Sequence, residues 1–350
     1  MSIGYLLRKA AEYDEIDYKP SSDSLRILVV GVGGAGCNAI WRMKSLGLDV
    51  PTIAINTDYP HLRMVDADMK VLLKVGNGHG TGGRVDLGEM SAEMARDKIR
   101  DLFQGADVVF ITAGLGGGTG TGATPVIADI ARREGAMVIT TVTLPFKWEK
   151  VRQARAREGL KKIMEKSNTV IVLENEKLLD VVSNRPLNDA FRVMDQLISY
   201  AIMSFVDILT KPSLINIDLA DLRYIMESGN ASTMLLGEGA WDDIRKIVIE
   251  ALNNPLINVD YSNADGALIH MTVGEDAPLN VIYSTVDTIS SFLKKNSKVS
   301  MGARVDPNYH GRMRLLVVLT GIKIPFLEEG SRKLIEEYEG EIDDIDFEVK

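Results

Sequence analysis

Several features that identify common protein classes are scarce or missing in this sequence of 350 residues. The one cysteine, Cys37, excludes a disulfide framework and favours a reducing, cytoplasmic setting. The four histidines are scattered, so no set of cysteines and histidines has the spacing of a metal site. A net charge of −9 without a basic cluster argues against nucleic-acid binding. These absences favour a cytoplasmic protein without a nucleic-acid partner.

Long apolar runs suited to a membrane are also missing. Residues 108–128 carry no charge, but they are crowded with glycine and unsuited to a membrane helix. Residues 197–205 are strongly apolar and too few to span a bilayer. The first residues lack the order of charged, apolar and cleavage regions that defines a signal peptide. We therefore expect no direct insertion into a membrane.

Glycine, in contrast, is plentiful, and the richest glycine segment is residues 114–125. It follows an expected strand at 107–112 and precedes a helix expected from Val126, with Pro125 in the first turn of that helix. A turn between a strand and a helix brings free backbone N–H groups and the positive end of the helix to an anion. The segment therefore predicts a phosphate-binding turn.

Two further glycine-rich turns follow expected strands. Residues 31–36 come after a strand at 25–30 and before a helix expected from about Cys37, and residues 76–83 come after a strand at 70–74. The carboxyl ends of parallel strands meet at one edge of a sheet, where such folds bind ligands. Three turns at that edge suit a long phosphate chain. The Gly-Lys-Ser/Thr ending of a Walker loop is absent.

An alternative interpretation is a nicotinamide-dependent oxidoreductase. Residues 31–36 have the Gly-x-Gly-x-x-Gly pattern in the context of a strand and a helix, and Asp58 stands where an NAD site needs an acid for the ribose. The sequence offers no recognisable proton donor for such a reaction. The alternative also leaves the turn at 114–125 unexplained.

The alternation of strands and helices predicts an α/β fold with a doubly wound, mainly parallel sheet of the Rossmann-like type. Apolar residues at three- and four-residue spacing predict a long helix at 187–209, apolar almost all round in its second half and therefore buried between two domains. After it, mixed strands and helices predict a smaller α/β domain. The expected order is an N-terminal extension (1–24), a nucleotide-binding domain (25–186), the central helix (187–212), a second domain (213–326) and an acidic tail (327–350).

Two carboxylates, Asp218 and Asp221, stand three residues apart at an expected helix start, and Asn216 precedes them. One interpretation is structural, with Asp218 as the N-cap and Asp221 favoured by the helix dipole. The other is catalytic: the two carboxylates orient and polarise an attacking water. Because they lie in the second domain, a neighbouring molecule is better placed than the same molecule to bring them to the phosphate.

The segment Gly-Gly-Gly-Thr-Gly-Thr-Gly at 116–122 resembles the signature of the tubulin/FtsZ GTPase family. The segments at 33–38, 55–58 and 216–221 match other motifs of that family in the same order, so the resemblance covers about residues 25–326. It implies a GTP-hydrolysing, cytoplasmic cell-division protein whose subunits polymerise head to tail, with GTP or GDP between successive subunits. It favours this function over the oxidoreductase.

The resemblance also implies roles for single residues. Glu149 and Arg152 match contacts to the ribose and the phosphates, with Arg155 as the reserve for Arg152. Asn175 and Asp195 match guanine readers; an acid suits guanine because its N1–H and 2-amino group are both donors. Phe191 resembles the ring that packs on the base. The remaining nucleotide contacts implied are Gly33, Gly34, Asn38, Asn56, Gly116, Gly117, Gly118, Thr119 and Gly120.

By the same resemblance, Asn216, Asp218 and Asp221 form the loop that reaches the GTP of the next subunit and completes its hydrolysis. Mg²⁺ is expected with the phosphates, without an identifiable protein ligand. The alternation of apolar residues within the acidic tail suggests docking to a membrane adaptor at the division site, unless the tail is merely solvated. A GTP-binding regulator that does not hydrolyse GTP is a third interpretation, which the Asp218 and Asp221 pair disfavours.

Overall fold

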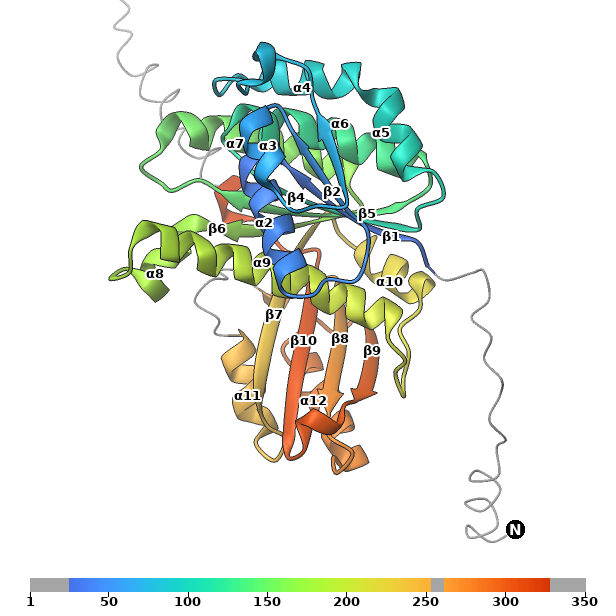
Figure 1. Cartoon of the computed structure of the whole chain (residues 1–350). Coiled ribbons are helices and arrows are strands. Elements are labelled where there is room, and N and C mark those ends of the chain that lie inside the picture. Colours follow the sequence, from blue (N-terminus) through green and yellow to red (C-terminus); the bar gives the residue numbers. More distant parts are fainter. Residues whose placement is uncertain (1–24, 253–260, 328–350) are drawn as a thin grey trace, which may run out of the picture.

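The computed structural model describes residues 25–252 and 261–327. These residues build a ten-stranded sheet in the order β3-β2-β1-β4-β5-β6-β7-β10-β8-β9, with helices packed on its faces (Figure 1). The N-terminal extension lies outside the described residues. So does the tail beyond Leu327, including the apolar residues expected to dock on an adaptor.

The first six strands are parallel and have the order 3-2-1-4-5-6 of a doubly wound fold. Most of their apolar residues are buried, because helices cover both faces of this part of the sheet. The expected fold class is therefore confirmed. The strands are β1 (Ile27–Val32), β2 (Thr52–Asn56), β3 (Met69–Leu72), β4 (Val108–Gly114), β5 (Met137–Leu144) and β6 (Thr169–Glu174). The helices are α2 (Gly33–Ser45), α3 (Tyr59–Met64), α4 (Val85–Met94), α5 (Arg96–Phe103), α6 (Gly118–Arg133), α7 (Lys150–Lys166) and α8 (Leu178–Val182).

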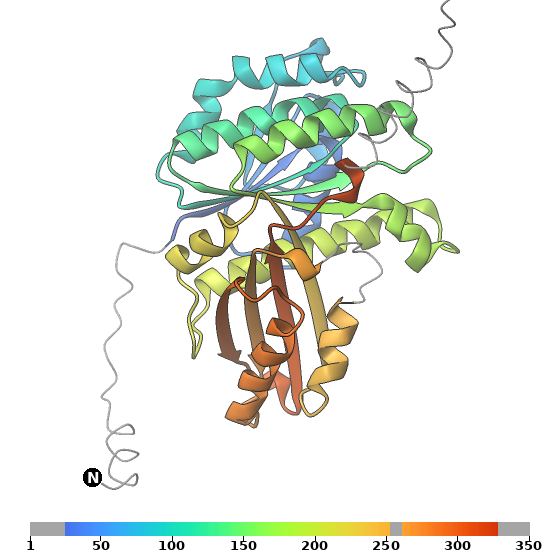
Figure 2. The same cartoon turned by 180° about the vertical axis from the view of Figure 1, so that it is seen from behind.

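The last four strands form a mixed sheet, in which β10 runs antiparallel to β7 and β8, and β9 runs parallel to β8. Only two residue pairs, Val170 with Ala231 and Ile171 with Ser232, join this part to β6. Seen from behind, α11 and α12 cover one face of these strands (Figure 2). The elements are β7 (Ala231–Ala240), β8 (Gly266–Val273), β9 (Lys298–Val305), β10 (Arg312–Thr320), α10 (Leu219–Met226), α11 (Ile244–Leu252) and α12 (Leu279–Ser290).

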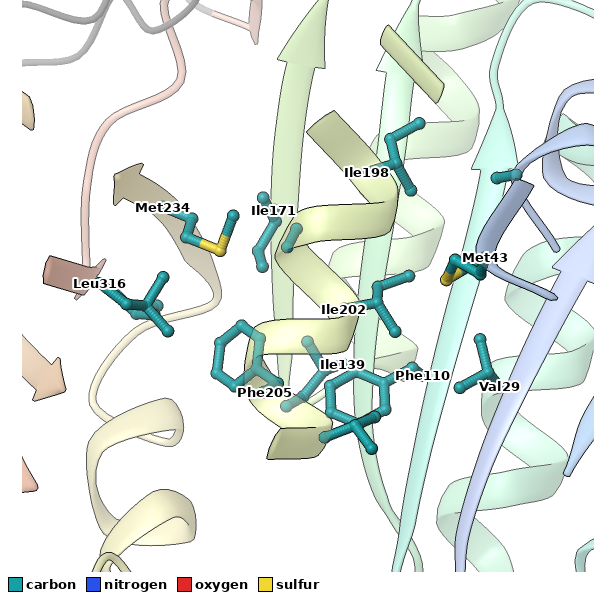
Figure 3. Packing of buried hydrophobic residues seen from close by; sticks show 14 of the residues in the cluster. Val29, Met43, Phe110, Ile139, Ile171, Ile198, Ile202, Phe205, Met234 and Leu316 are labelled. Atoms are coloured by element: carbon teal, nitrogen blue, oxygen red, sulfur yellow. The ribbon is translucent and has the colours of Figure 1, made fainter. Parts of the chain in front are cut away.

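The long helix α9 (Leu187–Thr210) lies between the two parts of the sheet, as the sequence predicts. Three of its side chains, Ile198, Ile202 and Phe205, pack against residues of the parallel strands on one side. On the other side lie Met234 and Leu316 of the last four strands (Figure 3). The rings of Phe205 and Phe110 are 5.7 Å apart. The helical stretch 188–210 is long and apolar enough to cross a bilayer, but Ile198, Ile202 and Phe205 within it are buried in the core.

Two helices begin earlier than the sequence predicts. Helix α2 begins at Gly33 rather than Cys37, and α6 begins at Gly118 rather than near Val126, so Pro125 lies in the interior of α6. The reason is close packing: a Cβ added at Gly120 would collide with the carbonyl of Gly114, and one added at Gly122 would collide with the backbone of α4. Only residues 115–117 of the expected phosphate-binding turn lie between β4 and α6.

Two consecutive helices, rather than one continuous helix, connect the third glycine-rich turn to β4. Helix α4 ends at Met94 and α5 begins at Arg96, with Ala95 at φ −96° and ψ 5° between them. The bend turns the buried Ile99 and Phe103 towards the sheet. Apolar periodicity alone does not reveal such a break, because both halves keep a helical pattern.

The buried histidine of β8, His270, is expected to make stability depend on pH. Burial, aided by Arg304 and opposed by Asp207, lowers its pKa from 6.5 to about 4. The unfolded chain therefore binds a proton at a higher pH than the folded chain does, so stability present above pH 6.5 is lost as the pH falls towards 4. At about 1.4 kcal/mol per pH unit, this loss approaches about 3 kcal/mol.

Urea unfolding of the protein and of His270→Gln, between pH 7 and pH 4.5, measures this effect. The variant should lose less of its free energy of unfolding over that interval than the parent chain. Parallel losses in the two proteins would show that other groups cause the pH dependence.

Candidate nucleotide-binding site

Two adjoining pockets open at the carboxyl edge of the parallel strands. The first, of about 790 Å³, lies between α2 and α9, and the second, of about 520 Å³, lies over the turn between β4 and α6. Because both are lined by Gly34, Ala35 and Phe191, they form one continuous groove. The groove is lined by eleven of the residues expected to bind nucleotide: Gly34, Asn38, Gly117, Gly118, Thr119, Gly120, Glu149, Arg152, Asn175, Phe191 and Asp195.

Two helix N-termini meet at the groove. The N-cap residues of α2 and α6, Val32 and Gly117, make no side-chain cap, so the first backbone N–H groups of both helices remain available to a ligand. The two helix ends are adjacent, since a Cβ added at Gly33 would lie 3.0 Å from the backbone nitrogen of Gly120. Two positive helix ends at one point favour a group with several negative charges, such as a phosphate chain.

Two expected glycines lie behind the groove rather than in its lining. Gly33 has φ +72° and packs against α6. Gly116 has φ +95°, and a Cβ there would lie 2.7 Å from the Cβ of Arg152. Both positions require glycine, because their backbone is in the left-handed region. They shape the turn and make room for Arg152.

Glu149 and Arg152 form an ion pair of 2.6 Å at the rim of the second pocket. The carboxylate of Glu149 also accepts a hydrogen bond of 3.0 Å from the backbone N–H of Phe146, which fixes it at the start of α7. Arg155 points elsewhere: its Nη1 lies 2.8 Å from the position of a Cβ at Gly83. The geometry thus favours Arg152 over Arg155 as the basic contact.

At the other end of the groove, Asp195 of α9 lies partly buried opposite Arg42 of α2. Burial raises the pKa of its carboxyl group to about 6, against the opposing charge of Arg42. A buried carboxylate is stabilised when a ligand supplies hydrogen-bond donors. This end of the groove is therefore suited to a group with paired N–H donors.

Asn56 is buried behind the groove and acts on it through His61. Its Oδ1 accepts the N–H groups of Thr57 and Asp58, so its Nδ2 donates to Nδ1 of His61 at 3.2 Å. The Nε2 of His61 must then carry a proton, which it donates to Oδ1 of Asn38 at 2.9 Å. This series of hydrogen bonds holds the side chain of Asn38, which lines the groove.

His61 was not identified from the sequence, because its role depends on contacts with two other elements. The one local signal is Asp58, which is the N-cap of α3 and accepts a hydrogen bond of 3.0 Å from the backbone N–H of His61. Asp58, the acid that the oxidoreductase interpretation assigns to a ribose, thus acts as a helix cap in this structure.

Aromatic rings form one wall of the groove. The ring centroids of Phe191 and Phe146 are 6.1 Å apart. The ring of Phe146 also stacks on that of Trp148, with 6.0 Å between the centroids and 14° between the ring planes. Trp148 is 72% exposed at the rim. Phe146 and Trp148 extend the apolar wall expected from Phe191 alone, and no sequence motif singles them out.

The acidic loop, defined as residues 213–221, is far from the groove. Asp218 is the N-cap of α10, and a reciprocal pair of hydrogen bonds of 2.7 and 3.4 Å joins it to Asp221, so both acids take part in a capping box. Asp218 and Asn216 are nevertheless exposed. The loop follows the end of α9 (Figure 1). Thr210, the last residue of α9, comes 15 positions after Asp195, which corresponds to a distance of about 22 Å along the helix. The acids and the groove thus lie near opposite ends of α9.

Within the described residues, no group of three or more histidine, cysteine, aspartate or glutamate side chains could hold a metal ion.

Comparison with known proteins gives consistent matches. Residues 26–183 match the family described as "Tubulin/FtsZ family, GTPase domain", and residues 229–323 match "FtsZ family, C-terminal domain". The chain is 41% identical over 326 residues to cell division protein FtsZ 2 of Halobacterium salinarum, covering 92% of this chain and 83% of the relative. It is 40% identical over 341 residues to cell division protein FtsZ 1 of Methanocaldococcus jannaschii, covering 93% and 94%.

Solved structures agree with these matches. An empty FtsZ dimer from M. jannaschii has a TM-score of 0.79 at 40% identity and covers 92% of this chain and 93% of its own. CetZ1 from Haloferax volcanii, at 19% identity, has a TM-score of 0.76 and shares the fold.

Proposed function

This chain belongs to the tubulin/FtsZ family, and we propose that each subunit binds GTP in its groove while the acidic loop of the next subunit completes hydrolysis. The protein is a GTP-binding, GTP-hydrolysing protein of cell division that forms filaments. The observation that carries the proposal is the position of the groove and the acidic loop near opposite ends of α9. Head-to-tail stacking brings one end of a subunit against the other end of its neighbour.

Each part of the groove has a role in this proposal. The uncapped N-termini of α2 and α6 stabilise the charge of the phosphate chain. Glu149 and Arg152 hold the ribose and the phosphates, while Asn175 and Asp195 read guanine and Phe191 packs on the base. A Mg²⁺ ion bound to the phosphates would neutralise charge that develops on them.

In the acidic loop, the exposed carboxylate of Asp218 takes up the proton of the attacking water, and Asp221 keeps Asp218 in position through their reciprocal hydrogen bonds. The Oδ1 of Asn216 accepts a hydrogen bond of 3.0 Å from the backbone N–H of Ser213. Its Nδ2 remains available to a phosphate oxygen of the neighbouring subunit.

We include in the proposal a location at the division site, with docking of the acidic tail to a membrane adaptor. The alternating apolar residues within the tail support this idea. A chain that ends at Leu327 should assemble and hydrolyse GTP normally but lose its location in cells; an unchanged location would remove the tail from the proposal.

The concentration dependence of GTP turnover tests hydrolysis between subunits. Phosphate release per subunit should be low below the assembly threshold and rise steeply above it, because the acids reach GTP only in a filament. Sedimentation with GTP and with GDP identifies the threshold in the same samples. Turnover per subunit that stays constant across the threshold would place the whole active site within one molecule.

A further inference from the structure

The acidic loop rests on the edge strand β9, and this contact suggests how its position is set. Ile215 and Ala303 exchange two backbone hydrogen bonds of 3.1 and 3.0 Å, which pair the start of the loop with β9 in an isolated antiparallel bridge. In an extended chain, alternate side chains point to opposite sides. Asn216 and Asp218 are accordingly exposed, while Ile217 between them is buried at 5% exposure.

Ile217 lies over a glycine. A Cβ added at Gly302 of β9 would lie 2.8 Å from Cδ1 and 2.9 Å from Cγ1 of Ile217. The same Cβ would lie 3.1 Å from Cδ2 of His270, the residue paired with Gly302 on the neighbouring strand β8. Ile217 therefore fills a space bounded by the backbone of Gly302 and the ring of His270, which we call the loop socket.

His270 is suited to be the wall of this socket. It is 7% exposed, and its Nε2 has no hydrogen-bond partner among the described residues. Arg304 of β9 and Asp207 of α9 are the charged groups that influence it, and burial together with Arg304 keeps the ring neutral near pH 7. A neutral ring packs beside Ile217 as an apolar surface would.

We propose that the loop socket sets how far the acidic loop projects towards the next subunit, with Gly302 and His270 as positioning residues for hydrolysis. Ile217 directly precedes Asp218 in the chain, and Asp218 is the N-cap of α10. An outward shift of the Ile217 side chain therefore also moves the carboxylate of Asp218. The inference rests on the proposed role of Asp218 between subunits. It assigns a catalytic consequence to residues that touch neither nucleotide nor water.

Gly302→Ala tests the socket, because the added methyl group must push Ile217 outwards. A misplacement of about 1 Å in a catalytic group can reduce a rate on the order of 100-fold, so we expect kcat per sedimented subunit to fall roughly 10- to 100-fold. The KM for GTP and the assembly threshold should stay within about twofold of the parent values, since the groove is at the other end of α9.

Gly239→Ala is a matched control. It also adds a methyl group to a strand of the same four-stranded part of the sheet, 2.9 Å from Cγ1 of Ile247 on the face covered by α11. The two variants should have similar thermal midpoints, but only Gly302→Ala should lose kcat. The double variant Gly302→Ala/Ile217→Ala, which removes both the Cδ1 and the Cγ1 that the new methyl group would meet, should recover most of the lost rate.

The outcomes separate this inference from the proposed function. Three results would each contradict the proposed role of the loop socket. They are a parental kcat in Gly302→Ala filaments, an equal loss of kcat in Gly239→Ala, and a kcat that stays low in the double variant. If Asp218→Ala itself retains hydrolysis, the proposed function fails instead, whatever the glycine variants do.

Discussion

Asp218→Ala should reduce GTP turnover roughly a thousandfold while GTP binding and filament formation persist, a loss typical of a removed general base. The carboxylate is exposed and lies near the opposite end of α9 from the groove, so its removal leaves every nucleotide contact of its own subunit in place. Loss of the N-cap of α10 costs about 1 kcal/mol of stability, which the domain can tolerate. Phosphate release and sedimentation measured in the same samples provide the readout.

Asp218→Asn is the control that separates the two roles of this residue. Asparagine caps a helix as well as aspartate does, but its amide cannot take up a proton from water. We therefore expect Asp218→Asn to restore the stability lost in Asp218→Ala without restoring turnover. Recovery of turnover in the asparagine variant would make Asp218 a structural cap and nothing more.

Asp195→Asn should have the second largest effect, on the choice of base. The carboxylate can accept both the N1–H and the 2-amino group of guanine, whereas an amide places one of its own donors against the amino group. Losing one charged hydrogen bond and leaving a donor unpaired corresponds to about 3 kcal/mol, or roughly a 100-fold weaker affinity for GTP. Xanthosine triphosphate, which has a carbonyl in place of the amino group, should bind the variant better than GTP does.

The pH dependence of binding is a second readout of the same residue. Because the free carboxyl group has a pKa of about 6 and the ionised form binds guanine, affinity for GTP should be constant above pH 6 and fall as the pH decreases below it. The decrease should approach about tenfold per pH unit. In Asp195→Asn this dependence should be absent, as measured by fluorescence titration with a labelled nucleotide. An equal dependence in both proteins would assign the titration to another group.

The sequence allowed the sheet to be predicted because its signals are local. Apolar strands alternate with helices and end in glycine-rich turns, which is enough to indicate a doubly wound sheet with ligands at its carboxyl edge. The helix starts were missed because glycine is a poor helix former. Gly118, Gly120 and Gly122 are helical in α6 because neighbouring backbone leaves no space for a Cβ, and such packing depends on segments distant in the sequence.

The candidate site shows the same division between local and distant information. Gly117, Gly118, Thr119 and Gly120 of the glycine-rich segment line the groove directly, and the sequence motif indicates them well. Asn56 belongs to a motif too, but it lies behind the groove and reaches it through His61 and Asn38, a chain of hydrogen bonds that joins three elements. The loop socket is also invisible in the sequence, since Ile217, His270 and Gly302 are brought together only by the pairing of β8 with β9 and of Ile215 with Ala303.

A mixture of two variants provides the most direct test of hydrolysis between subunits. Asp218→Ala subunits keep a GTP-binding groove but lack the acid, while Asp195→Asn subunits keep the acid and carry xanthosine triphosphate. GTP hydrolysis in the mixture must then occur in the groove of one variant with the acid of the other. With both nucleotides present, GTP turnover per Asp218→Ala subunit should reach about half the parent rate, because about half of its grooves face an intact acidic loop. GTP turnover no higher than that of Asp218→Ala alone, in mixed filaments that sediment normally, would contradict the account.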